Sequence, residues 1–421
     1  MNKKEILSCL KNNKKISDYE LKIVDKNSRE LFYVLHNLQI NRAVKVETVQ
    51  INVYVSDGKT TGSSIVTVTA ADDVKSLNAK LNKAVSKAKA VHNKYYPLPA
   101  KSKNITDKYK SKGSLNDIAN NVAEAVFKAD VYKDGWINST EIFVSEYKEE
   151  FINSRGINHS TNRFELQIEC IPTWKAEKEE IELYKFYESN DIDYKQITKE
   201  IKEILNQAKE RSMAKKLDEV KLPKKLKVLV KNDMLEEIVG YLANDLSYAS
   251  KYMKQNHYNK KDVISNNKFD LTMKSYVKGC SASRKYDGNG ITLSSKRLIK
   301  DGKVTGNYGD NKFGYYANEK NITGNLPVCV IDAKASSYKK QKHLIIESFS
   351  APQLEENLGY WGGEVRLARY FDGKKYIPIT GFSISGSLFD DLKTVEFSKE
   401  ENITERYKGP KYFIFNNVKI S

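Results

Sequence analysis

The sequence predicts an α+β protein, with two units of mixed sheet and helices followed by a largely antiparallel, β-rich C-terminal domain. Three observations predict this class. Alternating apolar and polar residues dominate the chain, a few segments show the i, i+4 spacing of buried helix faces, and glycine-marked turns become frequent after residue 259. A chain of 421 residues can form two or three domains with hydrophobic cores. We predict an N-terminal domain at 1–98, a middle domain at 99–222 and a C-terminal domain at 223–421.

The first 98 residues predict a short helix, a sheet and a longer helix. The strands are expected at 18–24, 30–40, 43–56 and 65–68. Turn-forming residues at 25–28 separate the first two strands, and Asp57-Gly58 marks a hairpin turn. Asp72 or Asp73 is predicted to cap a helix that extends to about His92.

The middle unit is predicted to follow a charged linker at 101–112. Ser114 or Asn116 is expected to cap its first helix, and a second helix is predicted from Asp193 to about Lys215. Four strands are expected between these helices, at 135–149, 151–153, 164–172 and 179–188.

The C-terminal unit begins with a predicted strand, turn and helix between Leu226 and Leu246. Asp233 is a good N-cap, and Glu236 stands three residues later, as in a capping box. One face of the predicted helix is apolar: Leu235, Ile238, Val239, Leu242 and Leu246. After it, Asp-Gly turns predict antiparallel hairpins, at Asp287-Gly288, Asp301-Gly302 and Asp372-Gly373.

Charge and cysteine content limit the class of protein. The net charge of +17 comes almost entirely from lysines that are spread along the chain among 54 acidic residues. The lysine clusters lack the interleaved aromatic residues that proteins use to bind single-stranded nucleic acid. This pattern argues against nucleic-acid binding. The first residues do not form a signal peptide, and no apolar run is long enough to span a membrane. The four cysteines are far apart and lack a CxxC pair, so we expect a cytoplasmic protein with reduced thiols.

The residues do not supply a complete catalytic constellation. The five histidines have no histidine or cysteine partner at helical or hairpin spacing, and neither a nucleophile elbow nor a Walker loop is present. The opposite face of the helix predicted between Leu226 and Leu246 carries the hexapeptide Glu236-Glu237-Ile238-Val239-Gly240-Tyr241. With histidines at its two ends, such a helix could bind zinc, with Glu237 as general base. Because these ends are Glu236 and Tyr241, the sequence predicts no metal ligands and no catalytic residues here.

Several segments together resemble the TldD/PmbA family, whose members are described as modulators of DNA gyrase and as metallopeptidases. The resemblance rests on the order of its blocks over nearly the whole chain: Asn153–Gly156 (NSRG), Tyr286–Ile291 (YDGNGI), Arg297–Val304 (RLIKDGKV), Thr323–Asn325 (TGN), Gly362–Arg366 (GGEVR), Pro378–Gly386 (PITGFSISG) and Asn416–Val418 (NNV).

In this family, TldD-like subunits carry His-Glu-x-x-x-His on a helix with a late cysteine ligand, whereas TldE (PmbA)-like subunits lack the metal site. The resemblance places Glu237 and Gly240 at matching positions but puts Glu236 and Tyr241 where the histidines would be, and no cysteine follows Cys329. It therefore implies a degenerate metal-site helix in a TldE-like chain.

That kind of chain is expected to be a non-catalytic subunit of a TldD/TldE-type metalloprotease complex that degrades or matures unfolded peptides. Its partner would be a TldD-like metallopeptidase that holds zinc, and extended peptides would be the ligands. The alternative is a stand-alone homodimeric peptide- or protein-binding protein of the same fold. A third reading is an active peptidase with an atypical metal site.

Overall fold

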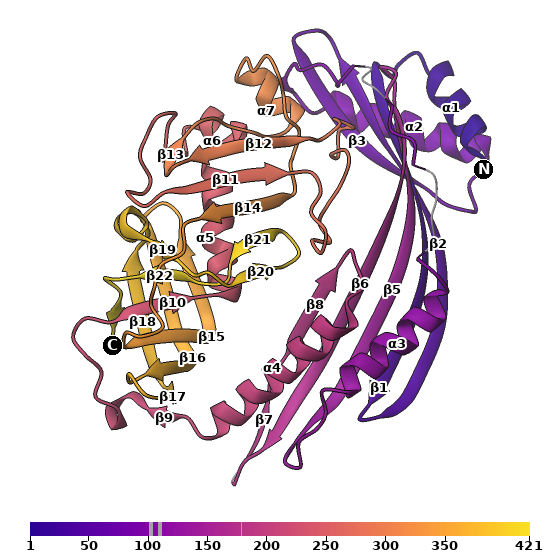
Figure 1. Cartoon of the computed structure of the whole chain (residues 1–421). Coiled ribbons are helices and arrows are strands. Elements are labelled where there is room, and N and C mark those ends of the chain that lie inside the picture. The colour runs from indigo at the N-terminus through magenta and orange to yellow at the C-terminus, as the bar shows by residue number, and fades with distance from the viewer. Residues whose placement is uncertain (101–103, 108–111, 178) are drawn as a thin grey trace.

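The computed structural model describes residues 1–100, 104–107, 112–177 and 179–421, so the predicted linker at 101–112 lies mostly outside the described residues. Figure 1 shows a large sheet of long strands beside a C-terminal part built from shorter strands. The combination of helices and three sheets confirms the predicted α+β class.

The first sheet has eight strands in the order β4-β3-β2-β1-β5-β6-β7, with β8 paired to β6. All of the neighbouring pairs are antiparallel. The strands are β1 (Asp18–Val34), β2 (Asn37–Ser56), β3 (Thr60–Val68), β4 (Asn93–Lys94), β5 (Gly135–Asn153), β6 (Asn158–Lys175), β7 (Glu180–Glu182) and β8 (Lys185–Ser189).

Strand β1 is longer than the sequence predicted. The expected turn at 25–28 is wrong, because these residues lie inside β1 and pair with both β2 and β5. The reversal comes instead at Leu35 and His36, where Leu35 has a φ of 52°. Pairing on both edges overrides the turn preference of the Asp, Asn and Ser residues in this segment.

Four helices cover one face of the first sheet and form two separate cores. α1 (Lys3–Asn12) and α2 (Val74–Lys89) pack on one half, and α3 (Leu115–Phe127) and α4 (Tyr194–Ser212) on the other. Two predicted caps are confirmed, since Asp73 and Ser114 each accept a backbone N–H in the first turn; Asp193, predicted as the start of a helix, does the same for α4. The predicted N-terminal and middle domains therefore have separate cores but share one sheet.

The C-terminal part holds two further sheets, of nine and six strands. The nine-stranded sheet has the order β19-β22-β10-β15-β16-β17-β9, with β18 paired to β16 and β23 paired to β18. Its strands are β9 (Lys215–Lys216), β10 (Lys227–Val230), β15 (His343–Glu355), β16 (Tyr360–Phe371), β17 (Tyr376–Thr380), β18 (Phe382–Ser387), β19 (Glu396–Phe397), β22 (Phe413–Phe415) and β23 (Lys419–Ile420). The six-stranded sheet contains β11 (Phe269–Lys274), β12 (Ser295–Lys300), β13 (Lys303–Val304), β14 (Val328–Ala333), β20 (Glu401–Ile403) and β21 (Tyr407–Pro410).

Most strand pairs in these two sheets are antiparallel, and three are parallel: β10 with β15, β17 with β9 and β14 with β21. The remaining helices are short except for the first: α5 (Asn232–Asp245), α6 (Tyr248–Met253), α7 (Asn311–Tyr316), α8 (Leu388–Asp391), and the 3₁₀ turns η1 (Leu217–Glu219) and η2 (Leu392–Thr394). The main C-terminal core contains side chains from α5 and from both sheets. Helix α5 is thus the element that joins the two C-terminal sheets.

Contacts at two places, among others, connect the first sheet and its helices to the C-terminal part. At one end, buried His159 of β6 accepts the Ile105 N–H at Nδ1 (3.0 Å), and its Nε2 is 2.9 Å from the Gly290 carbonyl. At the other end, Glu347 of β15 pairs with Lys231 and, at 3.0 Å, with Arg369. Arg369 also pairs with Glu210 of α4, with 2.6 Å between Nε and Oε2, so this group of charges extends to the helix.

All four cysteines are buried free thiols, without a disulfide. None of the helices in the described ranges is long and apolar enough to cross a membrane.

Candidate functional site

Helix α5 begins directly after β10, but it is not capped as predicted. The N-cap position is Lys231, which makes no side-chain cap hydrogen bond, and the helix starts at Asn232 with a φ of 52°. The predicted Asp233 cap and its capping box with Glu236 are therefore wrong. The Lys231 side chain is instead buried against Glu347, so the ion pair fixes the start of the helix.

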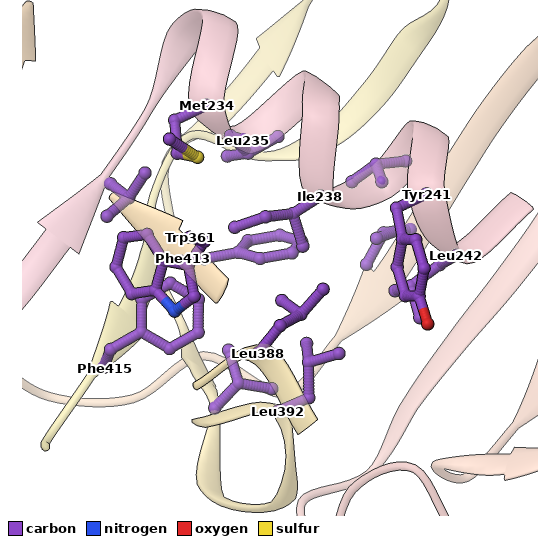
Figure 2. Close-up of a cluster of buried hydrophobic side chains, with 14 of the residues drawn as sticks. Met234, Leu235, Ile238, Tyr241, Leu242, Trp361, Leu388, Leu392, Phe413 and Phe415 are labelled. Carbon is purple, nitrogen blue, oxygen red and sulfur yellow. The ribbon is translucent and has the colours of Figure 1, made fainter. Parts of the chain in front are cut away.

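The apolar face of α5 is fully buried, as its periodicity predicted. Leu235, Ile238 and Leu242 have at most 2% of their surface exposed. Figure 2 shows this face directed at a cluster from distant segments: Trp361, Leu388, Leu392, Phe413 and Phe415. This packing fixes the rotation of α5 and so decides where Glu236 and Tyr241 point.

Glu236 is a half-buried carboxyl group on the side of α5 near the β20–β21 connection. Burial raises its pKa to about 7, and the charges of Asp233 and Glu405 act in the same direction, whereas the Thr404 hydroxyl acts against it. The neighbouring Glu237 also has a raised pKa, because of burial and Asp233. Gly240 is exposed, with open space where a Cβ would lie.

Tyr241 is buried, which corrects its predicted place on the open face of the helix. Its hydroxyl is 2.9 Å from Nδ1 of His257. Asp245, one turn further along α5, accepts the backbone N–H of His257 at 2.6 Å and that of Tyr258 at 3.0 Å. The ring of Phe389 packs against both Tyr241 and His257. Tyr241, His257 and Asp245 thus form one hydrogen-bonded cluster that holds the 257–258 loop on the helix.

The side chains around Glu236 and Tyr241 offer few free donors to a metal ion. Burial and the charge of Asp245 raise the pKa of Tyr241, so its phenol stays protonated, and its hydroxyl is engaged by His257. Asp245 is already occupied by two backbone N–H groups. Among the described residues, no three His, Cys, Asp or Glu side chains are grouped to hold a metal ion. Zinc needs three or four converging donors, and the donor set around Glu236 and Tyr241 does not fit it.

The block at Tyr286–Ile291, on which the resemblance partly rests, lies at the seam between the first sheet and the C-terminal part. The buried Asp287 carboxylate accepts three backbone N–H groups, from Asn289, Ile291 and Asn325, at 2.9–3.0 Å. Gly290 has a φ of 80° and packs against the Phe151 ring, so a Cβ would collide with that ring. This block therefore has a structural role, as a turn that docks onto β5 and β6.

Sequence reasoning missed a second group of charged residues near this seam. Arg163, Arg284, Lys112 and Lys285 line a cavity of about 200 Å³ together with Glu149. A wider hollow of about 710 Å³ lies at the far end of β6, around Trp174 and Met213. The residues that line these two hollows come from separate segments, so they show no sequence spacing that would predict a site.

Residues 223–421 match the family model described as the PmbA/TldA metallopeptidase C-terminal domain. The C-terminal domain of this chain belongs to the PmbA/TldD family. This match confirms the family that the ordered sequence blocks predicted. The search of curated protein sequences found no match.

Solved structures of similar fold include a TldE protein and two proteins described as modulators of DNA gyrase. TldE from Thermococcus kodakarensis has a TM-score of 0.79 at 15% identity, with 99% of this chain and 100% of that chain covered. A proposed modulator of a DNA gyrase from Thermotoga maritima has a TM-score of 0.78 at 13% identity, covering 100% and 99% of the two chains. A similar protein from Bacteroides thetaiotaomicron has a TM-score of 0.79 at 14% identity, covering 100% and 98%. These likenesses show that the whole chain has the fold.

The raised pKa of Glu236 predicts a pH-dependent stability of this PmbA/TldD domain. A carboxyl group whose folded pKa is about 7 binds its proton more tightly than the same group in the unfolded chain, with its value of 4.5. The free energy of unfolding therefore falls as pH rises from about 4.5 to about 7, by at most about 3 kcal/mol. Glu236→Gln is expected to reduce this fall, as measured by urea unfolding at several pH values. Glu364→Gln, at an exposed position on β16, is the matched control and should leave the profile unchanged; equal profiles for wild type and Glu236→Gln would contradict the prediction.

Proposed function

We propose that this chain is the non-catalytic, TldE-like subunit of a TldD/TldE-type metalloprotease complex that degrades or matures unfolded peptides. The observation that carries the proposal is the burial and hydrogen bonding of the Tyr241 side chain. The resemblance places a zinc-binding histidine at this position, whereas here the position holds a buried phenol that is hydrogen-bonded to His257. In such a complex, zinc and the catalytic residues would belong to a TldD-like partner, and this chain would help to hold an extended peptide.

A surface suited to a partner subunit lies along the outer edge of β2. β3 pairs only with residues 49–56 of β2, and no described strand covers the outer edge of residues 37–48. This segment carries exposed apolar side chains, with Leu38, Ile40 and Val46 between 45% and 49% exposed; the register shift near Tyr33 places Leu38 on one face and Ile40 and Val46 on the other. An unpaired strand edge with exposed apolar side chains is a template for pairing with another chain. We therefore propose this segment of β2 as the partner-binding surface.

The direct test is co-expression with a TldD-like protein encoded in the same genome. The expected result is a mixed complex that elutes as one species in size-exclusion chromatography and hydrolyses a casein-derived peptide, whereas this chain alone does not. Peptidase activity of this chain alone, lost on addition of a chelator, would overturn the proposal. A stable self-dimer that does not exchange with the TldD-like protein would favour the homodimeric binding protein.

The β2 surface can be tested within the same experiment. Ile40→Lys is expected to weaken the complex at least tenfold, because it places a charge in the apolar contact, while thermal stability of the free chain stays unchanged. Ile65→Lys, at another exposed strand position in the first sheet, is the matched control and should leave the complex intact. Equal weakening by both variants would show that the partner binds elsewhere.

A further inference from the structure

The cavity of about 200 Å³ at the seam is lined by residues from several segments that are distant in sequence, including Glu146 and Glu149 of β5. Arg163 comes from β6, Lys112 from the start of the middle unit, and Arg284 with Lys285 from the loop that leads to the docked turn at 286–291. The cavity therefore exists only where the first sheet and the C-terminal part meet.

The positive charges that line the cavity differ in how they are neutralised. Lys112 pairs with Asp191 at 2.9 Å and Lys285 pairs with Asp107. Arg163 pairs with both Glu149, at 3.2 Å, and Glu165. Each of these three cations thus has at least one carboxylate partner.

Arg284 is different. Its Nη1 donates to the carbonyl oxygens of Ser281 and Ser283, at 2.7 and 2.8 Å. Among the described residues, no carboxylate lies within ion-pair distance of it, and the residues outside the described ranges include no Asp or Glu. Its Nε and Nη2 groups have no described acceptor.

A guanidinium that is largely removed from water without an anion is an energetic cost to the folded state. Burial, with the adjacent charge of Arg163, lowers the pKa of Arg284, although Glu149, Glu165 and Glu188 oppose this shift from a distance. An anion in the cavity would remove the cost, because charge-assisted hydrogen bonds to a carboxylate are strong.

From this juxtaposition of an unpaired Arg284 and an adjoining cavity, we infer that the cavity binds a single carboxylate group of a bound peptide. The choice of a peptide rests on the proposed function. The volume of the cavity equals that of roughly six or seven water molecules at about 30 Å³ each. This is enough room for one acidic side chain or for a C-terminal residue. Arg284 accordingly selects for a negative charge at one position of the peptide.

Binding of three labelled hexapeptides to the purified chain, measured by fluorescence anisotropy, tests this inference. The first contains one glutamate and a C-terminal amide, the second has glutamine in its place, and the third has glutamine with a free C-terminal carboxylate. At least one carboxylate-bearing peptide is expected to bind about tenfold or more tightly than the neutral one. Tighter binding of the glutamate peptide would mean that the cavity takes an acidic side chain. Tighter binding of the peptide with a free C-terminus would mean that it takes the chain end.

Arg284→Gln is expected to remove this preference, and Arg284→Lys to retain part of it. Arg297→Gln, which removes an exposed arginine of β12, is the matched control and should keep the preference. The inference is overturned if wild type binds the three peptides equally or not at all, or if Arg297→Gln acts like Arg284→Gln.

If Arg284→Gln does not fold, hydrogen exchange of the wild-type chain decides the matter. The carboxylate peptide should protect residues 161–164 and 276–285, and the neutral peptide should not; equal protection would reject the site. Because these measurements use the chain alone, failure to find a TldD-like partner would not affect their outcome.

Discussion

Replacing Glu347 with alanine is expected to lower the free energy of unfolding by about 3–5 kcal/mol, because it leaves buried cations without their anion. The Glu347 side chain is fully buried, and Lys231 and Arg369 both pair with it. Gln207 of α4 also donates to its Oε2, at 3.2 Å. The variant therefore disrupts the start of α5, strand β16 and the contact with α4 together.

Glu203 of α4 also contacts Lys231, at 3.4 Å, and carries a negative charge at neutral pH. Burial acts to raise the pKa of Glu203, but the nearby Lys231, Lys411 and Arg369 outweigh it and bring the value to about 2. Urea unfolding monitored by tryptophan fluorescence measures the loss on Glu347→Ala. Asp390→Asn is the matched control, since its pair with Lys393 is exposed and should contribute less than about 1 kcal/mol. A change of similar size in both variants would contradict the assigned role of Glu347.

Trp361→Ala is expected to cost about 3–5 kcal/mol of stability, mainly through the cavity that it creates beneath α5. The indole has no exposed surface, lies in the cluster of Figure 2 and contacts the ring of Phe415 at a centroid distance of 4.8 Å. Its Nε1 also donates to Asp391 Oδ2 at 2.8 Å, so the variant leaves a buried carboxyl group without this partner.

Thermal and urea unfolding of the variant give the magnitude, and two controls separate its causes. Trp361→Phe keeps most of the volume but loses the hydrogen bond to Asp391, so a smaller loss than for alanine is expected. Leu358→Ala, at a site that is 78% exposed, should change stability by no more than about 0.5 kcal/mol. A Trp361→Ala protein as stable as wild type would show that the cluster does not hold α5.

Local sequence was a reliable guide to the buried face of α5 and to the N-caps of α2 and α3. The apolar spacing from Leu235 to Leu246 requires a buried face whatever it packs against, so the sequence alone predicted it. The Asp-Gly hairpins at 301–302 and 372–373 were predicted for a similar reason, since their turn chemistry depends on adjacent residues.

The errors arose where distant residues decide the outcome. The segment 25–28 has turn-forming residues but is held as strand by neighbours on both edges. Tyr241 faces inward because His257 and Phe389, from other segments, cover it. The helix starts after Lys231 and not at the expected Asp233 cap, because Lys231 pairs with Glu347. Local sequence could not show this, since Glu347 lies more than 100 residues away along the chain.

The candidate site was predictable only in part. The degenerate hexapeptide was visible in the sequence because its residue types stand at a known spacing. The cavity beside Arg284 was not, because an unpaired charge can be recognised only when all neighbours are placed. No sequence pattern predicts that an arginine will lack an acidic partner in the folded chain.

The position of β1 in the middle of the first sheet has a consequence for synthesis of the chain. β1 emerges from the ribosome early, yet one of its two partners, β5, starts only at Gly135. Until then, the nascent chain carries the β1–β2–β3 hairpins with an open edge on β1 that can pair with other chains. The open edge of β1 is therefore exposed to wrong pairing in the nascent chain until β5 has been made.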